Sequence, residues 1–135
     1  MTYLVDANVL SEATKPSPAA KVLDWLRHNE REIVVNPIIL GEIRFGIERL
    51  PPGRRRRRFQ DWFDQGIEKL TCLPFEAESG IRWAQLLAKL YASGTQMPLK
   101  DSLIAATALV HGLTVATRNV RDFQKAGVRV VDPFA

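Results

Sequence analysis

The amino-acid sequence predicts a three-layer α/β/α fold with a central parallel β-sheet. Short apolar runs of strand type alternate with segments of helical periodicity along the whole chain, an alternation typical of parallel sheets covered by helices on both faces. The length of 135 residues and the hydrophobic content of 46% fit one compact domain, residues 1–135, with a sizeable core. We therefore expect a single α/β domain.

Five segments have the length and composition of strands: 2–5, 32–35, 70–73, 113–116 and 128–131. Between them the spacing predicts a short helical turn at 8–14 and longer helices at about 19–28, 37–50, 54–69, 75–93 and 101–111. Pro37 suits the first position of a helix, because its missing N–H would be unpaired there in any case. Pro51-Pro52-Gly53 ends that helix, and Gly112 ends the last one.

Charge and cysteine content restrict the class of protein. The net charge of +4 and the isoelectric point of 9.6 favour a polyanionic partner, either nucleic acid or an acidic protein segment. The lone Cys72 cannot form an internal disulfide, and its apolar surroundings predict that it packs in the core. The first residues carry no basic leader, and no apolar stretch is long enough to span a bilayer. We expect a cytoplasmic protein without membrane contact.

Four acidic residues fall at junctions between predicted elements: Asp6, Glu42, Asp101 and Asp122. Ligands of open parallel sheets bind beyond the carboxyl ends of the strands, and Asp6 directly follows the first strand. Alone, Asp6 with Asn8 would equally suit an Asx turn that starts a helix. Four carboxylates brought together raise one another's pKa unless a cation is present, and hard divalent cations prefer oxygen ligands. The pattern therefore predicts a divalent metal site.

Two of these acids lie on segments that otherwise face the core. Glu42 has no basic residue three or four positions away on its helix, which is unusual for a solvated structural glutamate. Asp101 begins an almost continuous apolar helix, where it would cap the helix, and that role is compatible with holding a metal. The adjacent Lys100 is expected to be a solvated loop residue.

The segment from Thr117 to Asp122 supplies the fourth acid and several polar neighbours. Asp122 follows a predicted strand, although it would equally pair with Arg118 or Arg121 at the surface. We expect Asn8, Ser11 and Thr117 to orient the carboxylates, while each also suits a turn or a helix cap.

Five consecutive arginines form the most conspicuous charge run: Arg54, Arg55, Arg56, Arg57 and Arg58. On a helix they point in all directions, so they cannot make one flat basic face. Some are expected to contact nucleic-acid phosphates or acidic residues of a protein partner, and the others are expected to be solvated.

Four motifs occur in order along the chain: Asp6-Ala7-Asn8, then residues 41–46 (GEIRFG), 101–108 (DSLIAATA) and 117–123 (TRNVRDF). In this order the chain resembles PIN-domain ribonucleases, in particular the VapC-type toxins of bacterial type II toxin–antitoxin modules and their FitB-like relatives. Asp6, Glu42 and Asp101 match the first three acids of that family. For the fourth position, Asp122 is preferred and Asn119 is the alternative.

The resemblance implies a Mg²⁺ or Mn²⁺ site, endoribonuclease activity, a homodimer and inhibition by a cognate antitoxin. Asp6 and Asp101 would hold the metal, while Glu42 and Asp122 would bind a second ion or position water for hydrolysis of an RNA phosphodiester bond. Single-stranded or looped RNA is the expected substrate, since its bases are accessible. Other readings remain: a PIN nuclease outside toxin–antitoxin modules, a poorly fitting aspartyl phosphotransferase, or a catalytically silent PIN-fold regulator that binds an antitoxin and DNA.

Overall fold

The computed structural model describes residues 1–135 and contains one five-stranded sheet. All neighbouring strands are parallel, in the order β3-β2-β1-β4-β5. The strands are β1 (Tyr3–Val5), β2 (Ile33–Val35), β3 (Thr71–Cys72), β4 (Thr114–Ala116) and β5 (Arg129–Val131). Each lies within one of the five segments predicted from the sequence, so the parallel sheet is confirmed.

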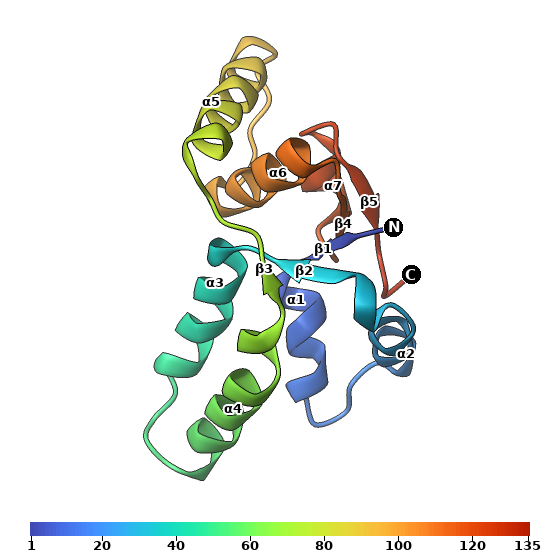
Figure 1. Cartoon of the computed structure of the whole chain (residues 1–135), viewed down its shortest axis with the longest axis vertical. Helices are drawn as coiled ribbons and strands as arrows, with labels where there is room; N and C mark the ends of the chain where they lie inside the picture. Colours follow the sequence, from blue (N-terminus) through green and yellow to red (C-terminus); the bar gives the residue numbers. More distant parts are fainter.

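The connections between strands place helices on both faces of the sheet. The helices are α1 (Ala7–Leu10), α2 (Ala20–His28), α3 (Pro37–Glu48), α4 (Arg54–Gln65), α5 (Ala77–Ala92), α6 (Leu99–His111) and α7 (Val120–Gln124). The chain runs from β1 to β3 toward one edge and then returns to β4 and β5 on the other side of β1. Because parallel crossovers are right-handed, α1 to α4 cover one face and α5 to α7 the other (Figure 1). The three-layer α/β/α prediction is confirmed.

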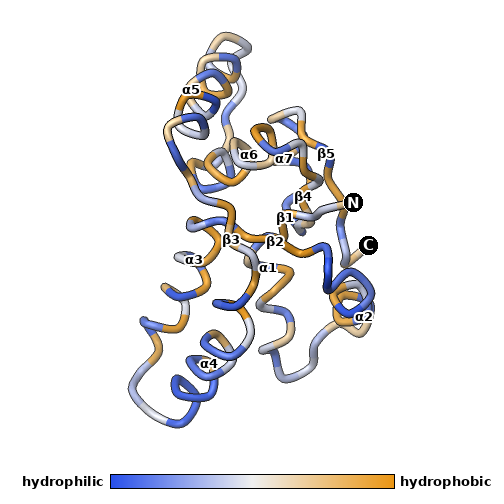
Figure 2. The backbone as a smooth tube through the Cα atoms, viewed as in Figure 1, coloured by the Kyte–Doolittle hydropathy of each residue, from blue (hydrophilic) through white to orange (hydrophobic).

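The core lies on both faces of the three inner strands. Residues of β2 and β4 are all buried. In Figure 2, β2 is strongly hydrophobic, whereas the start of α4 is strongly hydrophilic. β3 is an edge strand with both residues exposed, so Cys72 is exposed and the prediction that it packs in the core was wrong. An apolar neighbourhood in the sequence does not show that a strand lies at an edge.

The helices differ from the sequence prediction in several places. The helix expected over 54–69 ends at Gln65, and a 3₁₀ turn, η3 (Ile67–Lys69), follows Gly66, a residue with poor helix propensity. The last long helix begins at Leu99, directly after Pro98, and not at Asp101. The short helix α7 was not predicted at all. None of the helices combines the length and the apolar character that crossing a bilayer requires.

Candidate active site

Buried polar side chains follow three neighbouring strands at their carboxyl ends. Asp6 follows β1, Asn36 follows β2 and Thr117 follows β4, and their exposed fractions are 2%, 0% and 0%. The connections after β1 and β4 leave toward opposite faces of the sheet, which makes this edge a topological switch point. This is the place where parallel α/β sheets bind ligands.

Asp6 is held in one orientation by hydrogen bonds to both of its carboxylate oxygens. Its Oδ1 accepts from the backbone N–H of Ala7 (2.8 Å), and its Oδ2 accepts from Thr117 Oγ1 (2.7 Å) and Asn8 Nδ2 (3.4 Å). Asn8 and Thr117 therefore both contact Asp6. Ser11 forms no such hydrogen bond: its backbone oxygen accepts from the Thr14 hydroxyl instead.

Asn36 links two helices that carry acids, and sequence analysis missed it. Its Oδ1 accepts from the N–H of Ile39 (2.9 Å) and caps α3, while its Nδ2 donates to Thr107 Oγ1 on α6 (3.0 Å). Glu42 lies on α3 and Asp101 on α6. An asparagine directly before a proline at a helix start signals a cap, but nothing local signals the bond to Thr107.

Asp101 lies in the first turn of α6, and the expectation that it caps the helix was wrong because α6 begins two residues earlier. Its side chain is buried, with a 4% exposed fraction. Burial, followed by the charges of Asp6, Asp122 and Glu42, raises the pKa of Asp101 to about 6, against an opposing effect of Lys100. The other three acids are thus all near enough to act on Asp101.

Glu42 forms an ion pair that the sequence did not predict. Lys100 lies on α6 and its Nζ is 2.9 Å from Glu42 Oε2, so it is not a solvated loop residue. The hydrogen bond to Glu42 raises the pKa of the Lys100 ammonium. The second oxygen, Glu42 Oε1, is buried and has no hydrogen-bond partner. A buried carboxylate oxygen without a donor is costly, so it marks a place for a cation or water.

Asp122 and Asn119 contribute differently to this region. Asp122 lies on α7, and its Oδ1 is 3.4 Å from Lys125 Nζ, so its partner is neither Arg118 nor Arg121. The backbone N–H of Asn119 donates to Thr117 Oγ1 (3.0 Å). Asn119 therefore supports the hydroxyl that holds Asp6, and the contact runs through its backbone.

We use the name acidic site for Asp6, Glu42, Asp101 and Asp122. As placed, no group of three or more histidine, cysteine, aspartate or glutamate side chains is close enough to hold a metal ion, so the structure contains no preformed cage. The ligand chemistry nevertheless fits a hard divalent cation. The available donors are carboxylate oxygens, one of them is an unpartnered buried oxygen, and burial raises the pKa of Asp6 as it does that of Asp101.

The raised pKa of Asp101 predicts how the metal-free protein responds to pH. The folded state holds this proton up to about pH 6, whereas the unfolded chain releases it near 3.8, so stability falls as pH rises between those values. We expect the free energy of unfolding of the wild type, relative to Asp101→Asn, to decrease from pH 4 to pH 6 in EDTA. Urea unfolding at several pH values measures this difference, and a difference independent of pH would contradict it.

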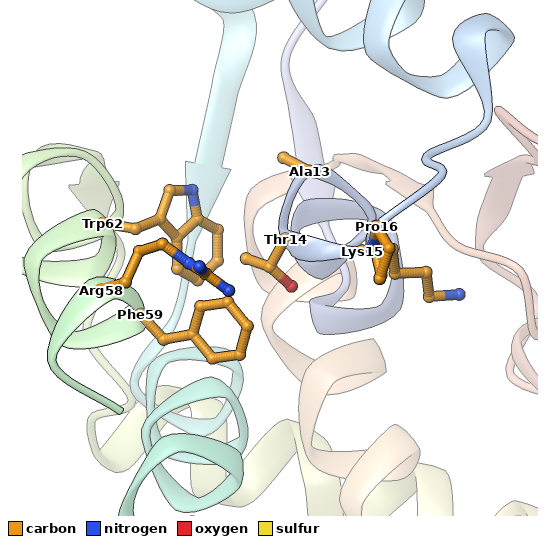
Figure 3. Close-up of a pocket in the computed structure, with 7 residues that line it drawn as sticks. All are labelled: Ala13, Thr14, Lys15, Pro16, Arg58, Phe59 and Trp62. Atoms are coloured by element: carbon orange, nitrogen blue, oxygen red, sulfur yellow. The ribbon is translucent and has the colours of Figure 1, made fainter. Parts of the chain in front are cut away.

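A separate hollow lies between α4 and the 3₁₀ turn η1 (Ser11–Thr14). It has a volume of about 430 Å³, and none of the four acids lines it. In Figure 3, Arg58, Phe59 and Trp62 of α4 face Thr14 across the hollow. The arginine run begins the same helix.

The five arginines of that run have different surroundings. Arg56 pairs with Glu48 (2.6 Å), and the guanidinium groups of Arg55 and Arg58 lie 5.5 and 5.3 Å from the centre of the Phe59 ring. Arg54 and Arg57 are exposed and form no ion pair. Positive charge at a helix N-terminus interacts unfavourably with the helix dipole, so the arginine run lowers the stability of α4. An anionic partner bound there would offset this effect.

The fold and the acidic site together define a class: an α/β/α protein with carboxylates gathered at the switch point of a parallel sheet. The chain belongs to the PIN domain family, whose profile matches residues 3–128, and within it to the group of VapC ribonucleases and FitB toxins. The resemblance seen in the sequence motifs is therefore confirmed.

Individual relatives are similar over almost their whole length. The VapC ribonuclease Y4jK of Sinorhizobium fredii is 34% identical over 97% of this chain and 96% of its own. The toxin FitB of Neisseria gonorrhoeae is 33% identical over 97% of both chains. The crystal structure of FitAcB from Neisseria gonorrhoeae superposes with a TM-score of 0.92 at 32% identity, covering 98% of this chain and 99% of the other.

Proposed function

We propose that this chain is a divalent-metal-dependent endoribonuclease and the toxin of a type II toxin–antitoxin pair. The observation that carries the proposal is a pair of buried acids, Asp6 and Asp101, in one region with the unpartnered buried oxygen of Glu42. Burial, followed by the charges of Asp6, Asp122 and Glu42, raises the pKa of Asp101 in that region. Relatives more than 30% identical over nearly the full chain are named as a ribonuclease and as a toxin, which supports the same activity here.

Asp6 and Asp101 would hold Mg²⁺ or Mn²⁺, because they are the two most buried acids of the site. A divalent ion bound there would lower the pKa of its water and offset the charge that develops on the phosphoryl oxygens. Thr117 and Asn8 fix the direction of the Asp6 carboxylate. Glu42 Oε1 is free to accept a proton from the attacking water. The water oxygen would bond to phosphorus as its proton passes to Glu42, the bond to the leaving oxygen would break, and the leaving oxygen would take up a proton from solvent.

RNA cleavage by the purified chain tests the proposed function directly. We expect it to cleave single-stranded or looped RNA with Mg²⁺ or Mn²⁺ present and to stop when EDTA removes the ion. Cleavage that continues undiminished in EDTA would contradict the metal-dependent mechanism. Absence of cleavage with either ion would favour the catalytically silent regulator instead.

The surface near α4 suits an acidic, partly apolar protein segment of the kind a cognate antitoxin would supply. The hollow offers the aromatic walls of Phe59 and Trp62, and Arg58 places a positive charge beside them. The net charge of +4 favours the same kind of partner. The homodimer and the antitoxin remain part of this proposal.

Arg54 and Arg57 are expected to contact RNA phosphates, because no acidic side chain of the chain neutralises them. Replacing both with Ala should weaken RNA binding and lower the slope of log K against log salt by about 0.7 for each lost phosphate contact. Fluorescence anisotropy in EDTA, which prevents cleavage, measures the slope at several salt concentrations. Arg31→Ala, an exposed arginine on the 3₁₀ turn η2 (Glu30–Glu32), is the matched control. If the salt slope of RNA binding did not change in the double variant, the arginine run would contact the protein partner and not RNA.

A further inference from the structure

Lys100 is a cation within the acidic site, and the hydrolysis proposed for the four acids assigns it no role. Its ammonium is 2.9 Å from Glu42 Oε2, and Lys100 directly precedes Asp101 in the first turn of α6. It therefore brings a positive charge into the site through its contact with Glu42. Its side chain is 51% exposed, so the ammonium remains within reach of a molecule that approaches from solvent.

The charge of the site decides how many divalent ions it takes. Four carboxylates paired with the ammonium groups of Lys100 and Lys125 leave a net charge of −2. One divalent ion neutralises that charge, whereas two would leave an excess positive charge of the same size. Like charges at close range in a partly buried site repel strongly, so a second ion is disfavoured while Lys100 is present.

The two oxygens of Glu42 also differ in their partners. Oε2 is occupied by Lys100, while the buried Oε1 has no partner. The ammonium thus takes the position on Glu42 that a second ion would need, and Oε1 remains without a partner. A site with two metal ions uses one of them to stabilise negative charge on the phosphodiester, and an ammonium supplies a smaller positive charge for the same purpose.

We propose that Lys100 replaces a second metal ion: the acidic site binds one divalent ion, and the Lys100 ammonium donates a hydrogen bond to a non-bridging oxygen of the scissile phosphate. This inference rests on the proposed nuclease function and adds to it the number of ions and a substrate-binding residue. Lysine suits the task because its ammonium is a compact point charge on a flexible stem. The stem lets it keep contact with Glu42 before RNA binds.

Titration calorimetry with Mn²⁺ tests the number of ions in the wild type, Lys100→Ala, Lys100→Arg and the control Lys21→Ala. Lys21 is an exposed residue of α2, which carries none of the four acids, so its variant removes the same charge elsewhere. We expect one ion per chain in the wild type, in Lys100→Arg and in Lys21→Ala. Lys100→Ala should bind two ions, because it frees Glu42 Oε2 and makes the site more negative.

RNA cleavage by the same proteins provides the second readout. Lys100→Ala should lower kcat/KM by about 100-fold, as expected when one donor to a developing oxyanion is lost. Higher Mn²⁺ concentrations should recover part of that loss, and Lys100→Arg should retain most of the activity. Lys100→Met, which keeps the apolar stem, replaces Lys100→Ala if thermal melting in EDTA shows that the alanine variant is not folded.

Two ions per wild-type chain would overturn the proposal, as would an unchanged stoichiometry and cleavage rate in Lys100→Ala. In both cases the nuclease function would stand, because the wild type would still bind Mn²⁺ and cleave RNA. A wild type that neither binds Mn²⁺ nor cleaves RNA would overturn the proposed function and this inference together.

Discussion

Replacing Asp101 with Asn is expected to lower RNA cleavage by on the order of 10³-fold while the protein remains folded. Asp101 is buried, and its pKa is raised by that burial and by the charges of the other three acids. Asn has nearly the same size as Asp but no charge. The variant loses a metal ligand and the charge that would attract the ion. Because the carboxylates repel one another, the metal-free variant should be at least as stable as the wild type.

Single-turnover cleavage of RNA with saturating Mg²⁺ measures this effect, and circular dichroism verifies the fold. Asp24→Asn is the matched control, since Asp24 is an exposed aspartate of α2 that pairs only with Arg27 (3.6 Å). Equal cleavage by the wild type and Asp101→Asn would remove Asp101 from the active site. A similar loss in Asp24→Asn would show that the assay reports general damage.

Replacing Asn36 with Ala is expected to give the largest loss of stability among substitutions of polar residues discussed above. The variant removes the cap of α3, which costs about 0.5–2 kcal/mol, and leaves the buried Thr107 hydroxyl without its partner, which costs about 1–3 kcal/mol. The free energy of unfolding should therefore fall by about 1.5–5 kcal/mol. Urea unfolding measures it.

The same substitution should also reduce cleavage, because Asn36 couples α3 to α6 and so sets the spacing of Glu42 and Asp101. Asn29→Ala is the control: Asn29 Nδ2 donates to the backbone oxygen of Trp25 at the end of α2, a half-buried contact within one helix. Its removal should cost no more than about 1 kcal/mol. A loss in Asn36→Ala no larger than that of the control would show that the link between the helices carries little energy.

Local sequence patterns were sufficient for the strands and for most helices. Apolar runs such as 113–116 are short and bounded by Gly112 and by polar residues, so their strand character is visible without any tertiary information. Boundaries were less certain, because Pro98 starts α6 before Asp101. The five residues of α7 are too few to show a helical period, which explains why that helix was missed.

The four acids were predicted because strand ends and helix starts are local features of the sequence. The side chains that contact them or connect their helices could not be predicted in this way. Lys100 sits beside Asp101 in the sequence, yet its charge is used by Glu42 on another helix. Asn36 and Thr107 are separated by 71 positions and meet only because α3 packs against α6. In the same way, Cys72 lies in an apolar segment, but only the strand order shows that β3 is an edge strand.

By itself the sequence determined the parallel α/β/α architecture and the family, and it proposed four candidate acids, because periodicity, turn residues and motifs act over a few positions. Only the tertiary structure decided which cations share the acidic site, which oxygen of Glu42 remains free and which side chain joins α3 to α6. Such contacts depend on how distant helices pack against one sheet, and packing is a property of the whole chain.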